Sequence, residues 1–169
     1  MSKNKESNFR PDESRRVSMG VRSFSDICNS GLDFNASYQR GDVWDMENRV
    51  KFLDAIFAEI DTGSVLLAEI PAEVSVKTGI DYEVVDGKQR LSTIQDYLKD
   101  QFEYRGYKFS ELSRQDQIFL RRSTVRVGVL PEDSTKKERA QAFLATNDTG
   151  VPQSREHLNM VRKMVEEMD

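Results

Sequence analysis

The chain has 169 residues, of which 37% are hydrophobic and 32% are charged, a composition that suits one soluble domain. No apolar run approaches the ~20 residues of a membrane span, and the single cysteine and single histidine exclude an internal disulfide, a cysteine-cluster metal site and a histidine-rich metal nuclease site within this chain. The formal net charge of −4 argues against a strongly basic nucleic-acid binder.

The N-terminal segment differs from the rest of the chain in charge. Residues 1–20 are polar and show no hydrophobic periodicity, and residues 1–23 contain six basic and three acidic residues. We therefore expect a mobile basic arm over residues 1–20, followed by a single domain over residues 21–169. Two roles stay open for this arm: contact with nucleic acid or an acidic partner, and simple solubilisation.

A short strand and a polar loop are expected next. Leu32 and Phe34 alternate with polar residues, as in a strand. Gln39 and Arg40 then form a pair of side chains that can bind phosphate. The lone Trp44 can stack on a base, but a core position is the favoured interpretation.

A long amphipathic helix is predicted over residues 47–60, with Asp45 as its N-cap. Its expected buried stripe consists of Val50, Leu53, Ile56, Phe57 and Ile60. Residues 65–70 are typical of a buried strand, and residues 77–79 of a hairpin-like turn.

The second half of the chain alternates helices with one strand. A short hairpin is expected about Arg105-Gly106, a helix over residues 113–122 and a half-exposed strand over residues 125–129. Thr135 and Glu138 have the spacing of a capping box, which predicts the start of another helix.

The last predicted helix follows Ser154 as its N-cap. Val161, Val165 and Met168 belong to its apolar stripe. This stripe covers either the protein's own core or a partner, which includes a second copy of the chain.

The central stretch is residues 82–98, YEVVDGKQRLSTIQDYL. It predicts a strand from Tyr82, a tight turn at Asp86-Gly87 and a helix from about Lys88. Free backbone N–H groups at the start of this helix attract an anion. This stretch is therefore either a phosphate-binding turn or a plain strand–turn–helix connection with a polar corner.

The side chains around this turn favour phosphate chemistry. Lys88 and Arg90 supply cations, and the guanidinium of Arg90 suits bidentate phosphate contact. Gln89 can orient a water molecule, and Asp86 can hold a divalent metal or cap the helix.

Three stretches resemble one known family. VVDGKQRLSTIQDYL is similar to the DGQQR segment of the GmrSD-type restriction-endonuclease N-terminal domain family. Tyr38-Gln39-Arg40, followed by Trp44, resembles its early YQR-x-x-x-W element, and FLATNDTGVPQSREH resembles its late F-x-x-x-N-x-x-G-x-x-x-S-x-x-E element. The stretches occur in the family's order and span residues 38–157. Lys88 and Asp148 depart from the family pattern, which usually has Gln at the first position and N-T-G-G around the second.

The resemblance implies an α+β fold of the ParB/sulfiredoxin-like type, a small mixed sheet surrounded by helices. It also implies that the three motif loops converge on a nucleotide phosphate chain. In that arrangement the phosphate-binding residues are Gln39, Arg40, Gly87, Lys88 and Arg90.

The implied chemistry is transfer of a phosphoryl group from a nucleoside triphosphate to water, with Mg²⁺ as cofactor. Asp86, Gln89 and Asn147 are the implied catalytic residues, and Asp86 is also the implied metal ligand. Sulfiredoxin-like chemistry needs a cysteine in the phosphate loop, where this chain has Lys88.

Two classes of function stay open. One is an NTP-hydrolysing module of a DNA restriction, defence or phage counter-defence system that works with a separate nuclease, in a reducing cytoplasm. The other is a non-catalytic relative, with a viral protein as one form of it, that binds DNA or protein and modulates a restriction or nuclease complex. Expected partners are a nucleoside triphosphate, DNA, a nuclease or restriction subunit and a second copy of the chain, with no membrane involved.

Overall fold

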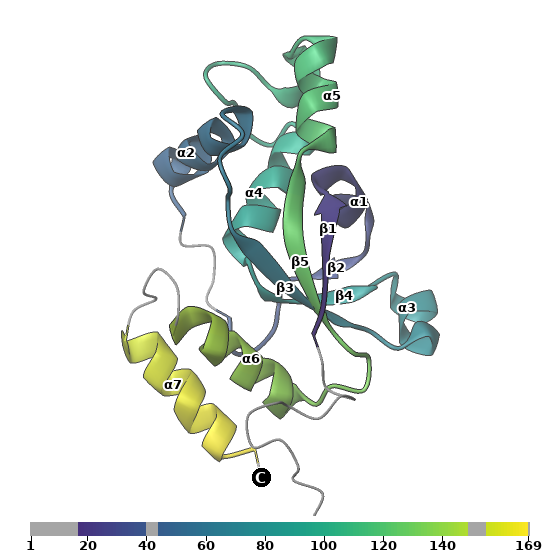
Figure 1. Cartoon of the computed structure of the whole chain (residues 1–169), viewed down its shortest axis with the longest axis vertical. Coiled ribbons are helices and arrows are strands. Elements are labelled where there is room, and N and C mark those ends of the chain that lie inside the picture. Colours follow the sequence, from purple (N-terminus) through teal and green to yellow (C-terminus); the bar gives the residue numbers. More distant parts are fainter. Residues whose placement is uncertain (1–16, 40–43, 149–154, 169) are drawn as a thin grey trace, which may run out of the picture.

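The computed structural model describes residues 17–39, 44–148 and 155–168, and in this part of the chain five strands form one mixed sheet (Figure 1). The strands are β1 (Ser18–Ser23), β2 (Leu32–Asp33), β3 (Ser64–Glu69), β4 (Tyr82–Asp86) and β5 (Thr124–Leu130). Their order is β1-β5-β3-β4-β2, with parallel pairing of β3 to β5 and of β2 to β4, and antiparallel pairing elsewhere. The expected α+β class, a small mixed sheet surrounded by helices, is confirmed.

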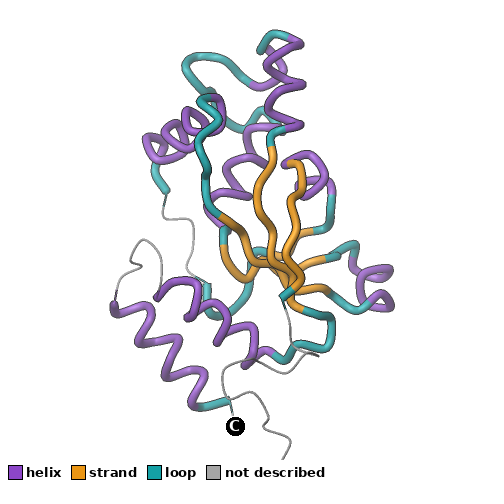
Figure 2. The backbone as a smooth tube through the Cα atoms, in the orientation of Figure 1, coloured by secondary structure: helices purple, strands orange, loops and turns teal. Residues whose placement is uncertain are grey.

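Helices cover both faces of this sheet, as Figure 2 shows by colour. The helices of the described residues are α1 (Phe24–Asn29), α2 (Met46–Phe57), α3 (Ala72–Thr78), α4 (Lys88–Leu98), the 3-10 helix η2 (Phe109–Glu111), α5 (Arg114–Arg122), α6 (Lys136–Asp148) and α7 (Arg155–Glu166).

The alternation of side chains along each strand separates two cores. Val65, Leu67, Val84 and Val127 point into the larger core, where residues of α1, α2, α4 and α5 bury their apolar sides. The neighbouring strand positions Leu66, Ala68, Val85 and Leu130 point to the opposite face, where α6, α7 and Tyr38 cover them. Tyr38 of the early motif, Val85 of the central stretch and Phe143 of the late motif therefore meet on the second face, while α4 packs on the first.

Local signals placed several elements correctly. Asp45 accepts a hydrogen bond from the Asn48 N–H at 2.9 Å, as expected of an N-cap. Thr135 and Glu138 form the expected capping box, with the Glu138 N–H 3.2 Å from Thr135 Oγ1 and the Thr135 N–H 2.8 Å from Glu138 Oε2. A bridge between Tyr104 and Tyr107 closes the expected hairpin.

Other predictions were wrong at the ends of elements. The first strand already begins at Ser18, so the arm expected over residues 1–20 overlaps β1 by three residues. Residues 77–79 end helix α3 rather than forming a simple hairpin turn, with Gly79 in the left-handed region at φ 71°. Helix α2 ends at Phe57, which leaves Ile60, expected on its buried stripe, 62% exposed.

The last helix packs on the chain's own core. Val161 and Val165 are buried in the second core, and Met168 is half-buried, so the interpretation as core residues holds for Val161 and Val165. Ser154, the expected N-cap, lies outside the described residues. None of the helices in the described part of the chain has the length and apolar character needed to cross a bilayer.

Candidate functional site

The predicted strand–turn–helix unit is present at the centre of the sheet. Strand β4 ends at Asp86, Gly87 has φ 94° and ψ 14°, and α4 begins at Lys88. This left-handed conformation favours glycine. A Cβ atom at Gly87 would lie 2.5 Å from Val65 Cγ1, so the close approach of the turn to β3 also requires glycine.

The N-terminus of α4 lies at the turn that follows β4. Among the described residues, no side chain caps it, and the first helical bond is the 3.0 Å bond from the Leu91 N–H to the Gly87 carbonyl. The backbone N–H groups of residues 88–90 come before Leu91, so the backbone hydrogen bonds of the helix itself do not use them. Together with the helix dipole they attract negative charge.

Arg90 holds the turn against the loop that precedes β3. Its Nη1 donates to the Thr62 carbonyl at 2.9 Å, and its Nη2 lies 3.7 Å from Asp86 Oδ2. A Cβ at Gly63 would come within 2.7 Å of Nη1, so the guanidinium fills the space that glycine leaves. Burial lowers the pKa of Arg90, and the neighbouring carboxylate of Asp86 opposes this shift.

The other side chains of the first helical turn reach toward the early motif. Lys88 Nζ donates to the Phe34 carbonyl at 3.1 Å. Gln89 Oε1 accepts from the Trp44 N–H at 3.2 Å. These bonds hold Phe34 and Trp44 beside the turn. They also mean that both polar groups already have partners within the protein.

Gln39 is the clearest link between the early motif and β4. Among the described residues, β2 pairs with β4 at Tyr82 and Glu83, and Gln39 contacts the next two residues of β4. The Gln39 amide donates to the carbonyls of Val84 and, at 3.1 Å, of Val85. Its Oε1 is buried without a hydrogen-bond partner in the described structure. Arg40, the second expected phosphate ligand in this motif, lies outside the described residues.

A buried polar network joins the early motif, β4 and α6. The Tyr38 hydroxyl donates to Glu83 Oε1, and Arg139 Nη1 pairs with Glu83 Oε2 at 3.0 Å. The side chains of Arg139 and Glu83 are only 10% and 15% exposed. Burial, together with the hydrogen bond to Glu83, raises the pKa of Tyr38 far above its ordinary value, so this hydroxyl stays protonated and donates.

The late motif packs on the same tyrosine. The rings of Phe143 and Tyr38 lie 5.5 Å apart, and His157 Nε2 is 3.0 Å from the Tyr38 carbonyl oxygen. Asn147 Nδ2, by contrast, donates to the Phe143 carbonyl at 2.7 Å, within its own helix. The structure thus brings the late motif to the early one, while the described contacts of the Asn147 side chain lie within α6.

Sequence reasoning missed Glu83, Arg139 and Thr62. Glu83 lies between Tyr82 and Val84, in a strand of otherwise β-forming residues. A charged residue at such a position is the one signal in the sequence that could have indicated a buried polar partner. The Thr62 carbonyl is a backbone group, and Arg139 resembles any other basic residue of a helix, so neither carries a signal in the sequence.

The residues present fit Mg²⁺ held together with a phosphate chain. No group of three or more His, Cys, Asp or Glu side chains that could hold a metal occurs among the residues the structure describes. Proteins commonly bind Mg²⁺ through one or two carboxylates plus substrate phosphates. The half-buried carboxylate of Asp86, at the C-terminal end of β4, matches such a donor set.

Comparison with known proteins gives one family and one solved structure. No significant match was found among curated proteins. The chain is similar to a solved chain described as "Structure of the C2221 form of Pnob8-like ParB-N domain", with 10% sequence identity and a TM-score of 0.49. The similarity covers 90% of this chain and 46% of the solved one, so the chain spans less than half of that protein's length.

The family assignment rests on the sequence itself. The family model described as "GmrSD restriction endonuclease, N-terminal domain" matches residues 24–142, which is well over half of the chain. The match includes the early motif and the whole β4–α4 unit. The chain therefore belongs to the family of GmrSD restriction endonuclease N-terminal domains.

Proposed function

We propose that this chain is a nucleotide-binding module of a DNA restriction, defence or phage counter-defence system, and that it hydrolyses a nucleoside triphosphate with Mg²⁺. The observation that carries this proposal is the uncapped N-terminus of α4 at Gly87, with Arg90 held beside it by Thr62 and Asp86. Family membership supports the biological setting, because the matching family is described as a restriction endonuclease domain.

Phosphate binding follows from the geometry of the turn. The start of α4 at Lys88 places the positive end of the helix dipole at this turn, where it attracts negative charge. Arg90 has five N–H donors, and the bond to Thr62 uses one of them. Because its guanidinium is held on two sides, Arg90 loses little conformational freedom when it contacts a phosphate.

Hydrolysis requires a metal donor and a positioned water molecule. Mg²⁺ would neutralise charge on the phosphates, with Asp86 as its protein ligand. Gln89 and Asn147 are the proposed water-orienting residues, and Gln39, Arg40 and Lys88 the additional phosphate contacts. On nucleotide binding, Gln89 would give up its hydrogen bond with Trp44, and Asn147 would give up its hydrogen bond with Phe143.

Those same bonds favour a second candidate function. Lys88, Gln89 and Asn147 all have partners within the protein, as expected of a motif that stabilises the fold. In this alternative the chain binds DNA or a nuclease or restriction subunit without turnover. Release of phosphate from Mg²⁺–NTP by the purified protein separates the two, because only the first function predicts it.

Arg90→Ala is expected to weaken nucleotide binding by about ten- to a hundred-fold, the loss of one charge-assisted hydrogen bond. Arg90→Lys recovers part of the affinity, since an ammonium lacks the planar fork. The measurement is calorimetric titration of Mg²⁺–NTP into folded protein.

A matched control for Arg90 is Arg49→Ala. Arg49 is similarly covered, with a side chain 16% exposed, and pairs with Asp96 of the same helix as Arg90 at 2.8 Å. This control loses a helix-bound ion pair but no phosphate contact, so it should bind nucleotide like the wild type. Equal affinity of Arg90→Ala and Arg49→Ala would contradict the phosphate-binding role.

Asp86→Asn is expected to lower turnover more than nucleotide affinity, because a group that acts mainly in the transition state affects the rate more than ground-state binding. Asparagine keeps the size of the side chain, so the fold should survive. Phosphate release at saturating nucleotide gives the turnover, and the same titration gives the affinity. Unchanged turnover would remove Asp86 from the catalytic residues.

A further inference from the structure

Strand β1 forms one outer edge of the sheet, because β5 is its only neighbour among the described strands (Figure 2). The pairing of β1 with β5 is regular over all six residues of β1, without a register shift. Besides this ladder, no hydrogen bond to the backbone of residues 18–21 occurs in the described part of the chain. The outward N–H and C=O groups of β1 are thus available to another strand.

This edge lacks the features that usually prevent strand pairing. Natural edge strands are commonly interrupted by proline, a bulge or outward charges. The sequence of β1, SMGVRS, contains no proline and one charged residue, Arg22. Arg22 turns away from the edge, since its Nη1 donates to the Tyr82 hydroxyl at 3.0 Å.

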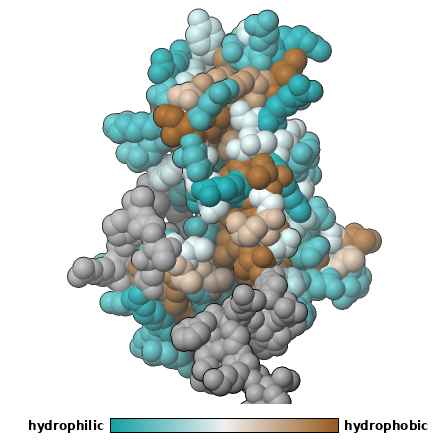
Figure 3. Space-filling view, viewed as in Figure 1, coloured by the Kyte–Doolittle hydropathy of each residue, from teal (hydrophilic) through white to brown (hydrophobic). Residues whose placement is uncertain are grey.

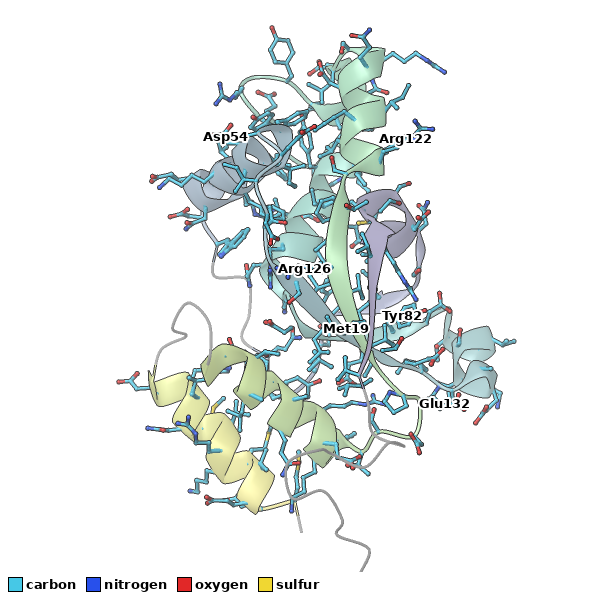
Figure 4. The ribbon with its side chains drawn as sticks, viewed as in Figure 1. Met19, Asp54, Tyr82, Arg122, Arg126 and Glu132 are labelled. Carbon is cyan, nitrogen blue, oxygen red and sulfur yellow. The ribbon has the colours of Figure 1, made fainter. Side chains whose placement is uncertain are left out.

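Hydrophobic side chains are exposed on the same strand. Met19 and Val21 are each 65% exposed, and their partners on β5 are Gly128 and Arg126. Figure 4 shows Met19 and Arg126 on one face of the sheet, and Figure 3 shows hydrophobic side chains along the middle of this face. Gly20, which lies between Met19 and Val21 on β1, also faces open space, because a Cβ atom there would meet no atom within 4 Å.

We propose that β1 pairs with β1 of a second copy of this chain, in antiparallel orientation about a two-fold axis through Gly20. Residues that lie opposite one another in such a pair share a face. This register puts Met19 of each copy opposite Val21 of the other, and Ser18 opposite Arg22. It covers the exposed apolar pair on both copies and opposes no like charges, and the two five-stranded sheets become one.

The surface beside this edge is also hollowed and partly apolar. A groove of about 850 Å³ adjoins Val21 at the C-terminal end of β1. Ile60 and Ile118, which line the groove with Val21, are 62% and 44% exposed. A copy seated on β1 covers the Val21 side of this apolar groove.

Two double variants of the full chain test both the pairing and its register by sedimentation velocity over a range of concentrations. The variant M19K/V21K places Lys opposite Lys across the two-fold axis and should weaken dimerisation by about tenfold or more. The variant M19K/V21D places Lys opposite Asp in the same register and should restore the dimer. Both positions are exposed, so the melting temperature of the monomer should change little.

Val76→Lys is the matched surface control, since Val76 is 87% exposed on α3, away from β1. It should dimerise like the wild type. A wild-type chain that stays monomeric at all concentrations would overturn the proposal, as would a dimer that M19K/V21K leaves intact. A dimer weakened by M19K/V21K but not restored by M19K/V21D would overturn the Gly20-centred register.

Discussion

Gly87→Ala is expected to lower the free energy of unfolding by about 2–4 kcal/mol, from the left-handed backbone and the steric overlap together. The new methyl group would lie 2.5 Å from Val65 Cγ1 and 3.3 Å from Val65 Cα. Val65 is 2% exposed and sits in the larger core, so it has little room to move away. Equilibrium denaturation in urea measures the change.

Gly106→Ala is the matched control for this substitution. Gly106 also has a positive φ, 82°, but a Cβ there would meet no atom within 4 Å. It should therefore cost only the backbone term, about 1–2 kcal/mol. If Gly87→Ala cost no more than Gly106→Ala, the close packing of the turn on β3 would be wrong.

Arg139→Met is expected to cost about 3–5 kcal/mol of folding stability, because it leaves the carboxylate of Glu83 buried without its cation. The two side chains are only 10% and 15% exposed, so water cannot replace the lost partner. The double variant E83Q/R139M should recover a large part of the loss, since the uncharged amide that replaces the Glu83 carboxylate still accepts from Tyr38. Urea denaturation of the three proteins measures these differences.

The exposed ion pair between Arg126 and Asp61 provides the comparison. Its atoms are 2.8 Å apart, as close as many buried pairs, but the side chains are 58% and 68% exposed. Arg126→Met should thus cost less than about 1 kcal/mol. Similar losses for Arg126→Met and Arg139→Met would show that the Glu83–Arg139 pair is not effectively desolvated.

The sequence predicted the central unit because its signals are local. Asp86-Gly87 marks the end of a strand, and Leu91, Ile94 and Leu98 have helical spacing. Leu91 and Ile94 are fully buried in the structure, and α4 begins at Lys88 as expected. The capping box at Thr135 and the hairpin at Arg105-Gly106 were predictable for the same reason.

The contacts that assemble the site depend on residues far apart in the chain. The partner of Gln39 is the backbone of β4, and that of Arg90 is the carbonyl of Thr62. Neither contact could be predicted, since a carbonyl has no sequence signature. The exposure of Ile60 was not predicted, because the helical spacing of apolar residues continues past Phe57, where α2 ends.

The most direct test of the proposed nucleotide site is calorimetric titration of ATP, GTP, CTP and UTP, each with Mg²⁺, into the wild-type chain and into Arg90→Ala. We predict saturable binding of at least one nucleotide with one site per chain, weakened by about tenfold or more in the variant. Absence of saturable binding for all four nucleotides, or equal affinity in the wild type and the variant, would contradict a phosphate-binding role for the β4–α4 turn.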